Sequence, residues 1–93
     1  MNGMKISYDP AKRDKTLAER QLDFIRAPEV FTGEQYTRQD KRKDYGEPRF
    51  ITIGTLDGRM VVLVWTPRGN ARHIISLRKA NGRERVRYQT CLG

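Results

Sequence analysis

Hydrophobic and polar residues follow one another along the chain with periods that change from segment to segment. Residues 4–8 alternate apolar with polar side chains, which is typical of a half-buried strand. Asp9 and Pro10 then predict a helix start, because Asp caps a helix N-terminus and Pro fits the first helical position. Apolar residues recur at helical spacing from Ala11 to Leu22, so we expect an amphipathic helix over this segment.

The next two segments predict a short helix and then a loop. Asp23 is a candidate cap for a helix whose apolar members run from Phe24 to Phe31. Pro28 would remove a backbone hydrogen bond within that helix, so the helix is either kinked there or begins later. Residues 32–48 are polar and charge-rich without a clear period, and we expect a mobile loop.

From residue 49 the pattern favours antiparallel sheet. Residues 50–53 are β-branched and aromatic, and Asp57 with Gly58 forms a hairpin-turn signal before the apolar run of residues 60–66. Turn residues follow, and residues 72–77 then read as a third strand. The sequence therefore predicts a three-stranded meander.

A capping box marks the last element. Asn81 is a candidate helix cap, and Glu84 stands at the position whose side chain reaches back to the cap. We expect a short helix over residues 82–90, with Val86 as its principal core contact and Tyr88 on a surface. Arg83 and Arg87 should line that same surface.

Together these elements predict an α+β fold: an N-terminal strand and two helices packed on an antiparallel meander, with a short C-terminal helix. Ninety-three residues fit a single domain spanning residues 1–93. Met4 is an alternative start, which would leave residues 1–3 outside the fold. No apolar run approaches the roughly 20 residues of a membrane-spanning helix, so no membrane partner is expected.

The N-terminus and the cysteine content predict a cytoplasmic protein. Residues 1–5 lack the apolar stretch of a secretory signal. The lone Cys91 has no partner for an internal disulfide and no neighbouring Cys or His for a zinc site. Both features fit a reducing compartment.

The charge is strongly basic and lies mostly in the last third of the chain. Lys and Arg total 19 against 11 Asp and Glu. Seven basic residues, six of them Arg, and one acid fall within residues 67–93. Arg binds phosphate through a planar fork of donors, so a nucleic-acid partner is indicated. A basic surface that aids solubility or attracts an acidic protein remains the alternative.

The residue types available restrict the chemistry. The chain has no Gly-rich phosphate loop and no nucleophile elbow. It has one His, so a pair of metal-ligating His residues is absent, and we expect neither metal nor cofactor. Arg, Lys, His, Tyr and Glu suit cleavage of a phosphodiester in RNA, where the 2′-hydroxyl attacks and the protein offsets charge and moves protons.

Each candidate residue has a structural alternative. His73 is a proton shuttle, or a packed or solvent-facing strand residue. Arg78 stabilises developing charge, or merely pairs with Glu84. Glu84 is a general base, or only the capping-box partner. Tyr88 stacks on a base or donates a proton, or else covers the sheet edge. Arg49 projects into the same site as these residues, or forms an ordinary surface ion pair with Glu47, two residues earlier.

Three segments together resemble the BrnT family: Ser7-Tyr8-Asp9-Pro10-Ala11-Lys12, Arg49-Phe50-Ile51-Thr52-Ile53-Gly54 and Ile74-Ile75-Ser76-Leu77-Arg78-Lys79-Ala80. The resemblance runs from about Met4 to Tyr88. It implies a ribonuclease toxin with a fold similar to RelE, inhibiting translation and growth and neutralised by a BrnA-type antitoxin. That antitoxin would contact operator DNA, and a toxin homodimer within a heterotetramer is compatible with it.

The resemblance carries over four residues and shows two departures. Arg49, Arg78, Glu84 and Tyr88 stand where the family pattern has the same residue types. His73 stands where the family usually has Arg. Glu19-Arg20-Gln21 replaces a common Lys-His-Gly, which removes the Gly that tolerates a left-handed helix end.

The resulting hypothesis is a metal-independent endoribonuclease. Arg78 and Arg49 would stabilise the phosphorane, and Glu84, His73 or Tyr88 would move protons. Backbone phosphates would be held by Arg68, Lys79, Arg83 and Arg85. The alternative is a non-catalytic module that binds nucleic acid or inhibits a protein with the same basic face. The hypothesis requires the late arginines to converge on one pocket with Tyr88 and Glu84.

Overall fold

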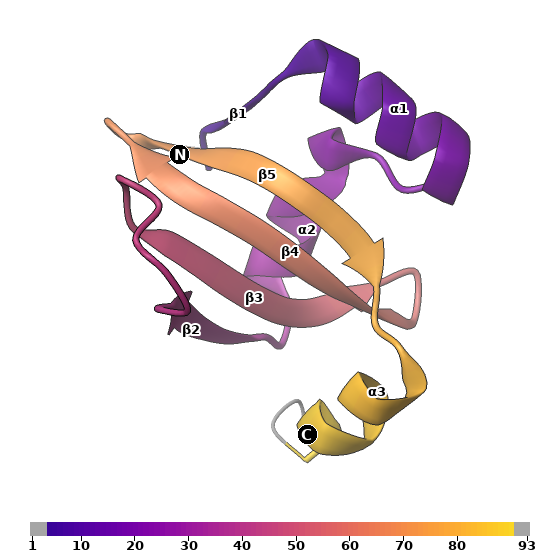
Figure 1. Cartoon of the computed structure of the whole chain (residues 1–93). Helices are drawn as coiled ribbons and strands as arrows, with labels where there is room; N and C mark the ends of the chain where they lie inside the picture. Colours follow the sequence, from indigo (N-terminus) through magenta and orange to yellow (C-terminus); the bar gives the residue numbers. More distant parts are fainter. Residues whose placement is uncertain (1–3, 91–93) are drawn as a thin grey trace.

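The computed structural model describes residues 4–90, so the expectations about residues 1–3 and Cys91 lie outside the described residues. Three helices, one 3-10 turn and five strands follow one another along the chain (Figure 1). In order they are β1 (Ile6–Tyr8), α1 (Pro10–Arg20), η1 (Phe24–Arg26), α2 (Ala27–Thr32), β2 (Tyr36–Asp40), β3 (Arg49–Leu56), β4 (Arg59–Arg68), β5 (Ala71–Lys79) and α3 (Gly82–Tyr88).

The strands form one mixed sheet in the order β1-β5-β4-β3-β2. The predicted meander of β3, β4 and β5 is confirmed, and its first turn has the left-handed backbone at Asp57 and Gly58 that a tight hairpin requires. The predicted N-terminal strand is also confirmed. It pairs parallel with β5, so the sheet is mixed and not wholly antiparallel.

The prediction of a loop over residues 32–48 is wrong in its first half. Residues Tyr36–Asp40 form β2, which pairs antiparallel with β3. This edge strand has polar side chains that are exposed up to Gln39, so its sequence lacks an apolar alternation. The backbone pairing with β3 stabilises it instead. Only residues 41–48 form a loop between the two strands.

The helices before the sheet begin where their caps predict. The Asp9 carboxylate accepts a hydrogen bond from the Ala11 N–H at the start of α1, and the Asp23 carboxylate caps η1. Pro28 lies in the first turn of α2, so the helix begins later than the apolar pattern suggests. The end of α1 is also informative: Gln21 adopts the left-handed conformation, at φ 56°, without the help of a Gly.

These helices cover one side of the sheet, which we call the helix face (Figure 1). Its fully buried residues include Phe24, Val30, Leu63 and Leu77. α2 approaches β3 so closely that a Cβ atom on Gly54 would lie 2.7 Å from Cγ1 of Val30. α1 contributes no fully buried residue, so its predicted amphipathic packing is weak, and Leu22 is buried just after the helix ends.

α3 begins with the predicted capping box, but its orientation differs from the prediction. Val86 is 75% exposed, whereas Tyr88 is 6% exposed and packs in a second small core with Ile53. The reason is geometric, because Glu84 is tied to the sheet through Arg78. Tyr88 lies four residues later on the same side of the helix, and Val86 therefore points away.

Candidate functional site

The side of the sheet opposite the helix face, which we call the open face, presents three rows of side chains across the strands. The strand register places residues in one row opposite one another, and alternate residues along a strand share a face. The first row is Tyr36, Ile53, Val62 and Arg78; the second is Arg38, Ile51, Val64 and Ser76; the third contains Asp40, Arg49, Thr66 and His73.

A bulge in β5 determines which of its residues reach this face. Val64 pairs with Ser76, but the next residue, Trp65, pairs with Ile74, so the register shifts there. Beyond the bulge the alternation is reversed. His73 therefore lies on the open face, while the guanidinium of Arg72 lies on the helix face, 4.3 Å from the centre of the Phe31 ring.

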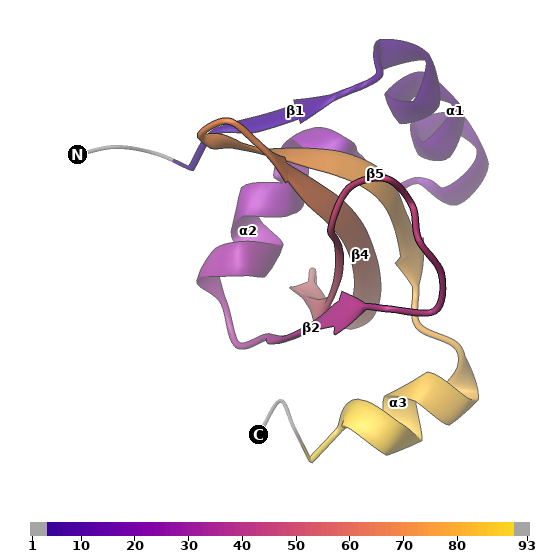
Figure 2. The ribbon, with the colours of Figure 1, turned by 60° about the vertical axis from the view of Figure 1, so that its left-hand side comes forward.

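α3 and the loop of residues 41–48 border the open face at opposite ends (Figure 2). At the α3 end, Arg78 donates two hydrogen bonds to the Glu84 carboxylate, at 2.7 and 2.8 Å. Glu84 also accepts the N–H of Asn81. Chiefly because of the Arg78 hydrogen bonds, the pKa of Glu84 falls to about 2. The Arg78 side chain is 42% exposed, so part of its guanidinium faces solvent.

At the loop end, a buried carboxylate organises the side chains. Asp40 accepts hydrogen bonds from the Arg42 side chain and from the Tyr45 hydroxyl, the latter at 3.0 Å. The Arg42 hydrogen bonds are the main reason that the pKa of Asp40 lies well below its usual range. Arg42 is also near enough to Arg78 for their like charges to oppose each other, which lowers the pKa of Arg78 slightly against the larger rise caused by Glu84.

Arg49 lies beneath this loop without a carboxylate partner among residues 4–90. Its guanidinium stacks on the Tyr45 ring at 4.1 Å from the ring centre. Its Nε atom is buried and has no hydrogen-bond partner. The expected ion pair with the neighbouring Glu47 is absent in this part of the chain, because Glu47 instead lies 3.5 Å from Arg68.

His73 lies at the same end of the face. Its Nδ1 is 2.9 Å from the Ser7 hydroxyl of β1. Burial, and next the charge of Arg68, lower the pKa of His73. Burial therefore favours the neutral imidazole, and the contact with Ser7 orients the ring.

The structure brings some predicted site residues together and separates others. Arg78 and Glu84 are in contact, whereas Arg49 and His73 lie in the third row, about 13 Å further along the strands by strand geometry. Tyr88 lies beside the first row of the open face. It is buried against Tyr36, with the ring centres 5.9 Å apart. The predicted convergence on one pocket is therefore wrong for the site as a whole.

The predicted phosphate-binding residues are also spread out. Lys79 and Arg85 border a hollow of about 270 Å³ beside the Asp57-Gly58 turn. Arg83 is exposed on α3, and Arg68 lies at the other end of the sheet beside Glu47.

Sequence reasoning missed three residues of the open face: Arg38, Arg42 and Tyr45. All three fall within the segment predicted to be a loop. The alternation of Tyr36, Arg38 and Asp40 on one side of β2 was the available signal.

Comparison with known proteins decides the family. The family model described as "Ribonuclease toxin, BrnT, of type II toxin-antitoxin system" matches residues 8–84. The chain belongs to the BrnT family. No curated protein matches the chain in a sequence search.

BrnT membership confirms the resemblance deduced from the sequence and makes the chain a ribonuclease toxin, with RNA as substrate and an antitoxin as partner. The matched segment ends at Glu84, so the family match does not cover Tyr88, which the sequence resemblance had assigned to the site. Within residues 4–90, no helix of this BrnT chain is long and apolar enough to cross a membrane. The same residues contain no cluster of three or more His, Cys, Asp or Glu suited to a metal ion.

Proposed function

We propose that this BrnT protein is a metal-independent endoribonuclease with a RelE-like arrangement, and that it cleaves RNA by attack of the substrate's 2′-hydroxyl on the adjacent phosphorus. The 5′-oxygen of the next nucleotide leaves, giving a 2′,3′-cyclic phosphate that can open to a 3′-phosphate. The observation that carries this proposal is Arg78, a part-exposed guanidinium on the open face, held in place by the two hydrogen bonds that it donates to Glu84.

Arg78 is suited to stabilise the phosphorane. Two of its donors are committed to Glu84, which fixes the plane of the guanidinium, and a third makes a long contact of 3.5 Å with the Lys79 carbonyl. The other donors are available to phosphate oxygens. Arg42 lies near enough to add a second positive charge. The rows of the sheet separate Arg49 from Arg78, so we assign Arg49 to a neighbouring phosphate of the same RNA strand.

Glu84 is the proposed general base, and substrate binding would strengthen it. In the free protein its pKa of about 2 makes it a weak base. A phosphate bound to the free donors of Arg78 brings negative charge beside the carboxylate, and this charge raises the pKa of Glu84 toward the ordinary value while the Arg78 contact is kept. His73 lies in the same row as Arg49, and it would move protons at the phosphate that Arg49 contacts. The burial of Tyr88 favours a packing role over proton transfer.

Membership of a family of type II toxins supports a proposal for the cellular role. We propose that RNA cleavage in the cytoplasm inhibits translation and growth, and that a BrnA-type antitoxin neutralises the toxin by covering the basic open face. The protein would meet operator DNA only through that antitoxin. A homodimer within a heterotetramer is one assembly compatible with this arrangement.

A cleavage assay with chelator tests the proposal. Purified protein should cut a single-stranded RNA at the same rate with and without EDTA, and the 5′ fragments should end in a cyclic or 3′-phosphate. Loss of cleavage on chelation, or fragments with 3′-hydroxyl ends, would contradict the proposal. RNA binding without any cleavage would favour the non-catalytic module.

A further inference from the structure

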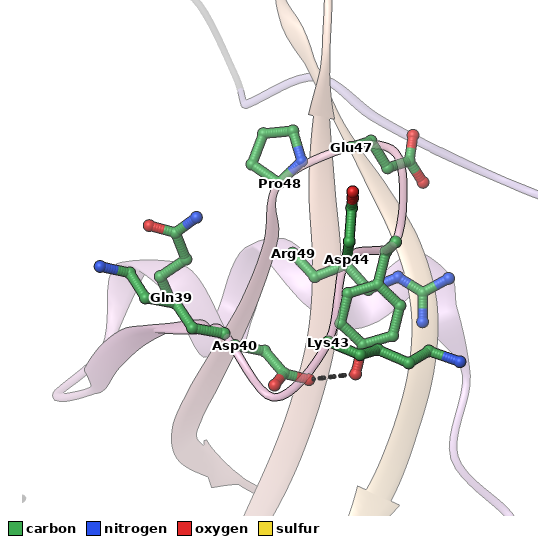
Figure 3. Close-up of a pocket in the computed structure, with 9 residues that line it drawn as sticks. Gln39, Asp40, Lys43, Asp44, Glu47, Pro48 and Arg49 are labelled. Atoms are coloured by element: carbon green, nitrogen blue, oxygen red, sulfur yellow. Dashed lines mark hydrogen bonds between the residues drawn. The ribbon is translucent and has the colours of Figure 1, made fainter.

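The loop between β2 and β3 borders an open hollow, and Arg49 is the one residue of its lining to which the cleavage mechanism gives a role. The volume of the hollow is about 560 Å³, and it lies at the edge of the sheet (Figure 3). The lining contains cationic, carboxylate, amide and aromatic side chains: Gln39, Asp40, Lys41, Lys43, Asp44, Tyr45, Glu47, Pro48 and Arg49. This volume and mixture suit a small ligand that has a flat polar ring and a nearby negative charge.

Tyr45 is held rigidly in this hollow. Its hydroxyl donates a hydrogen bond to Asp40 (Figure 3). Asp40 is 4% exposed, and its carboxylate also accepts from Arg42. The Arg49 guanidinium covers part of the ring from below the loop. The ring therefore needs little further ordering before a flat ligand can stack against the loop.

Cationic groups lie around the ring without committed partners. Lys41 and Lys43 make no ion pair within residues 4–90, and the Lys43 ammonium lies 5.1 Å from the centre of the Tyr45 ring. Arg49 makes no ion pair within the described part of the chain, and its guanidinium lies 4.1 Å from the centre of the same ring. These groups can take the phosphates that flank a bound nucleotide.

Asp44 is one of the hydrogen-bond acceptors in the lining of the hollow. One of its carboxylate oxygens, Oδ1, accepts the N–H of Gly46 at 2.9 Å and thereby fixes the tight turn of the loop. The other oxygen has no partner among the described residues, so it is available to a ligand. Figure 3 shows Asp44 on the loop beside Arg49, within the same hollow.

From this arrangement we infer that the loop hollow is a nucleotide subsite, which binds one unpaired base of the RNA substrate within a few nucleotides of the cut. The inference rests on the proposed function and adds base selection to it. Tyr45 supplies the stacking surface, the lysines and Arg49 hold the flanking phosphates, and Asp44 reads the edge of the base.

Guanine fits this acceptor better than the other bases. Its Watson–Crick edge carries two adjacent N–H donors. The free oxygen of Asp44 can accept one of them, and Oδ1 can accept the other with its second lone pair while it keeps the Gly46 N–H. Uracil presents one donor between two carbonyl oxygens, and these would repel the carboxylate. We therefore expect cleavage sites with guanine at one position near the cut and with uracil disfavoured there.

Sequencing of fragment ends from a random-sequence RNA pool tests base selection. Asp44→Asn keeps an oxygen for the Gly46 turn but replaces the free acceptor with a donor. It should reduce the guanine preference of the cleavage sites at least about fivefold. Asp14→Asn makes the same chemical change on α1 and should leave the base preference unaltered.

The aromatic requirement is tested by a matched pair of variants. Tyr45→Leu should raise KM about tenfold, because base stacking on an aromatic ring is lost. Tyr45→Phe keeps the ring and should raise KM less than about threefold. A wild-type-like base preference in Asp44→Asn, a preference for uracil, or equal KM values for the Leu and Phe variants would each overturn the inference.

Direct binding separates this inference from the proposed function. Guanosine 3′-monophosphate, uridine 3′-monophosphate and inorganic phosphate can each be titrated into isotope-labelled protein and followed by amide NMR. The inference predicts saturable shifts in residues 39–49 that are stronger for the guanosine nucleotide, even if the protein cuts no RNA. Shifts that are the same for all three compounds would overturn it, whereas absence of cleavage alone would overturn only the proposed function.

Discussion

The two faces of the central sheet differ in what their side chains do. On the helix face, apolar residues of η1, α2 and the strands are buried together, and the indole N–H of Trp65 is satisfied by Thr52 at 2.8 Å. On the open face, a smaller apolar cluster that includes Ile53 and Tyr88 is flanked by ion pairs between arginines and carboxylates. One face therefore stabilises the fold, while the other leaves charged groups available to a ligand.

The arginines of β5 show this difference within a single strand. Arg72 lies over the rings of Phe31 and Trp65, where its charge contributes to packing. Arg78 lies on the opposite face and shares its donors between Glu84 and solvent. The same residue type is thus structural or functional according to the face it occupies. Four expected effects test this difference between the two faces.

The largest effect is expected for Phe24→Ala on the helix face. Phe24 is fully buried and packs edge-on against Tyr8. Its truncation should lower the free energy of unfolding by about 3–5 kcal/mol, measured by urea denaturation. A loss below about 1 kcal/mol would mean that this face does not form the main core.

A smaller loss is expected for Gly54→Ala. The new Cβ would meet Cγ1 of Val30, a short and stiff side chain that is itself fully buried. The displacement of α2 should cost about 1–3 kcal/mol by the same measurement. Gly58→Ala is the comparison variant. At this position a new Cβ would meet no atom within 4 Å, but the backbone is left-handed, at φ +75°, so its cost measures backbone strain without crowding.

The Glu84 ion pair should make stability depend on acid pH. Its folded-state pKa of about 2 lies below the ordinary value of 4.5, so the stabilisation is present above pH 4.5 and is lost as the pH falls toward 2. The pair is partly solvated, so we expect about 1 kcal/mol. Glu84→Gln should show a flatter stability profile over this window in urea titrations; an unchanged profile would contradict the ion pair.

The smallest effect is expected for Arg38→Ala. Arg38 is exposed on β2 and shares the second row with Ile51, so it should contact only a backbone phosphate. We expect KM for RNA to rise about threefold to tenfold with kcat unchanged, and the salt dependence of binding to weaken by about one phosphate contact. A fall in kcat would instead place Arg38 at the reaction centre.

Local signals in the sequence predicted much of the fold. The caps at Asp9, Asp23 and Asn81 and the turn at Asp57 are determined by neighbours in sequence, and the structure confirms each of them. β2 was missed because its pairing with β3, and not its own side chains, makes it a strand.

The site was predicted less completely because it depends on contacts between distant residues. A period of two would place Arg72 and Arg78 on one face, but the bulge beside Trp65 places them on opposite faces. The orientation of α3 depends on the contact between Arg78 and Glu84, which exchanges the expected positions of Val86 and Tyr88. Arg78 and Glu84 themselves were predicted to pair or to act together, and the structure confirms the pair.

The most direct measurement compares Arg78→Ala with Arg72→Ala in the RNA cleavage assay, with the free energy of unfolding measured for both. If the open face carries the chemistry, Arg78→Ala should lower kcat about 100-fold to 1000-fold, while stability falls only by the roughly 1 kcal/mol of the lost ion pair with Glu84. Arg72→Ala should lose about 1–2 kcal/mol of stability and retain kcat within about threefold. Comparable kcat values in the two variants, or loss of activity in Arg72→Ala alone, would contradict the assignment of function to the open face.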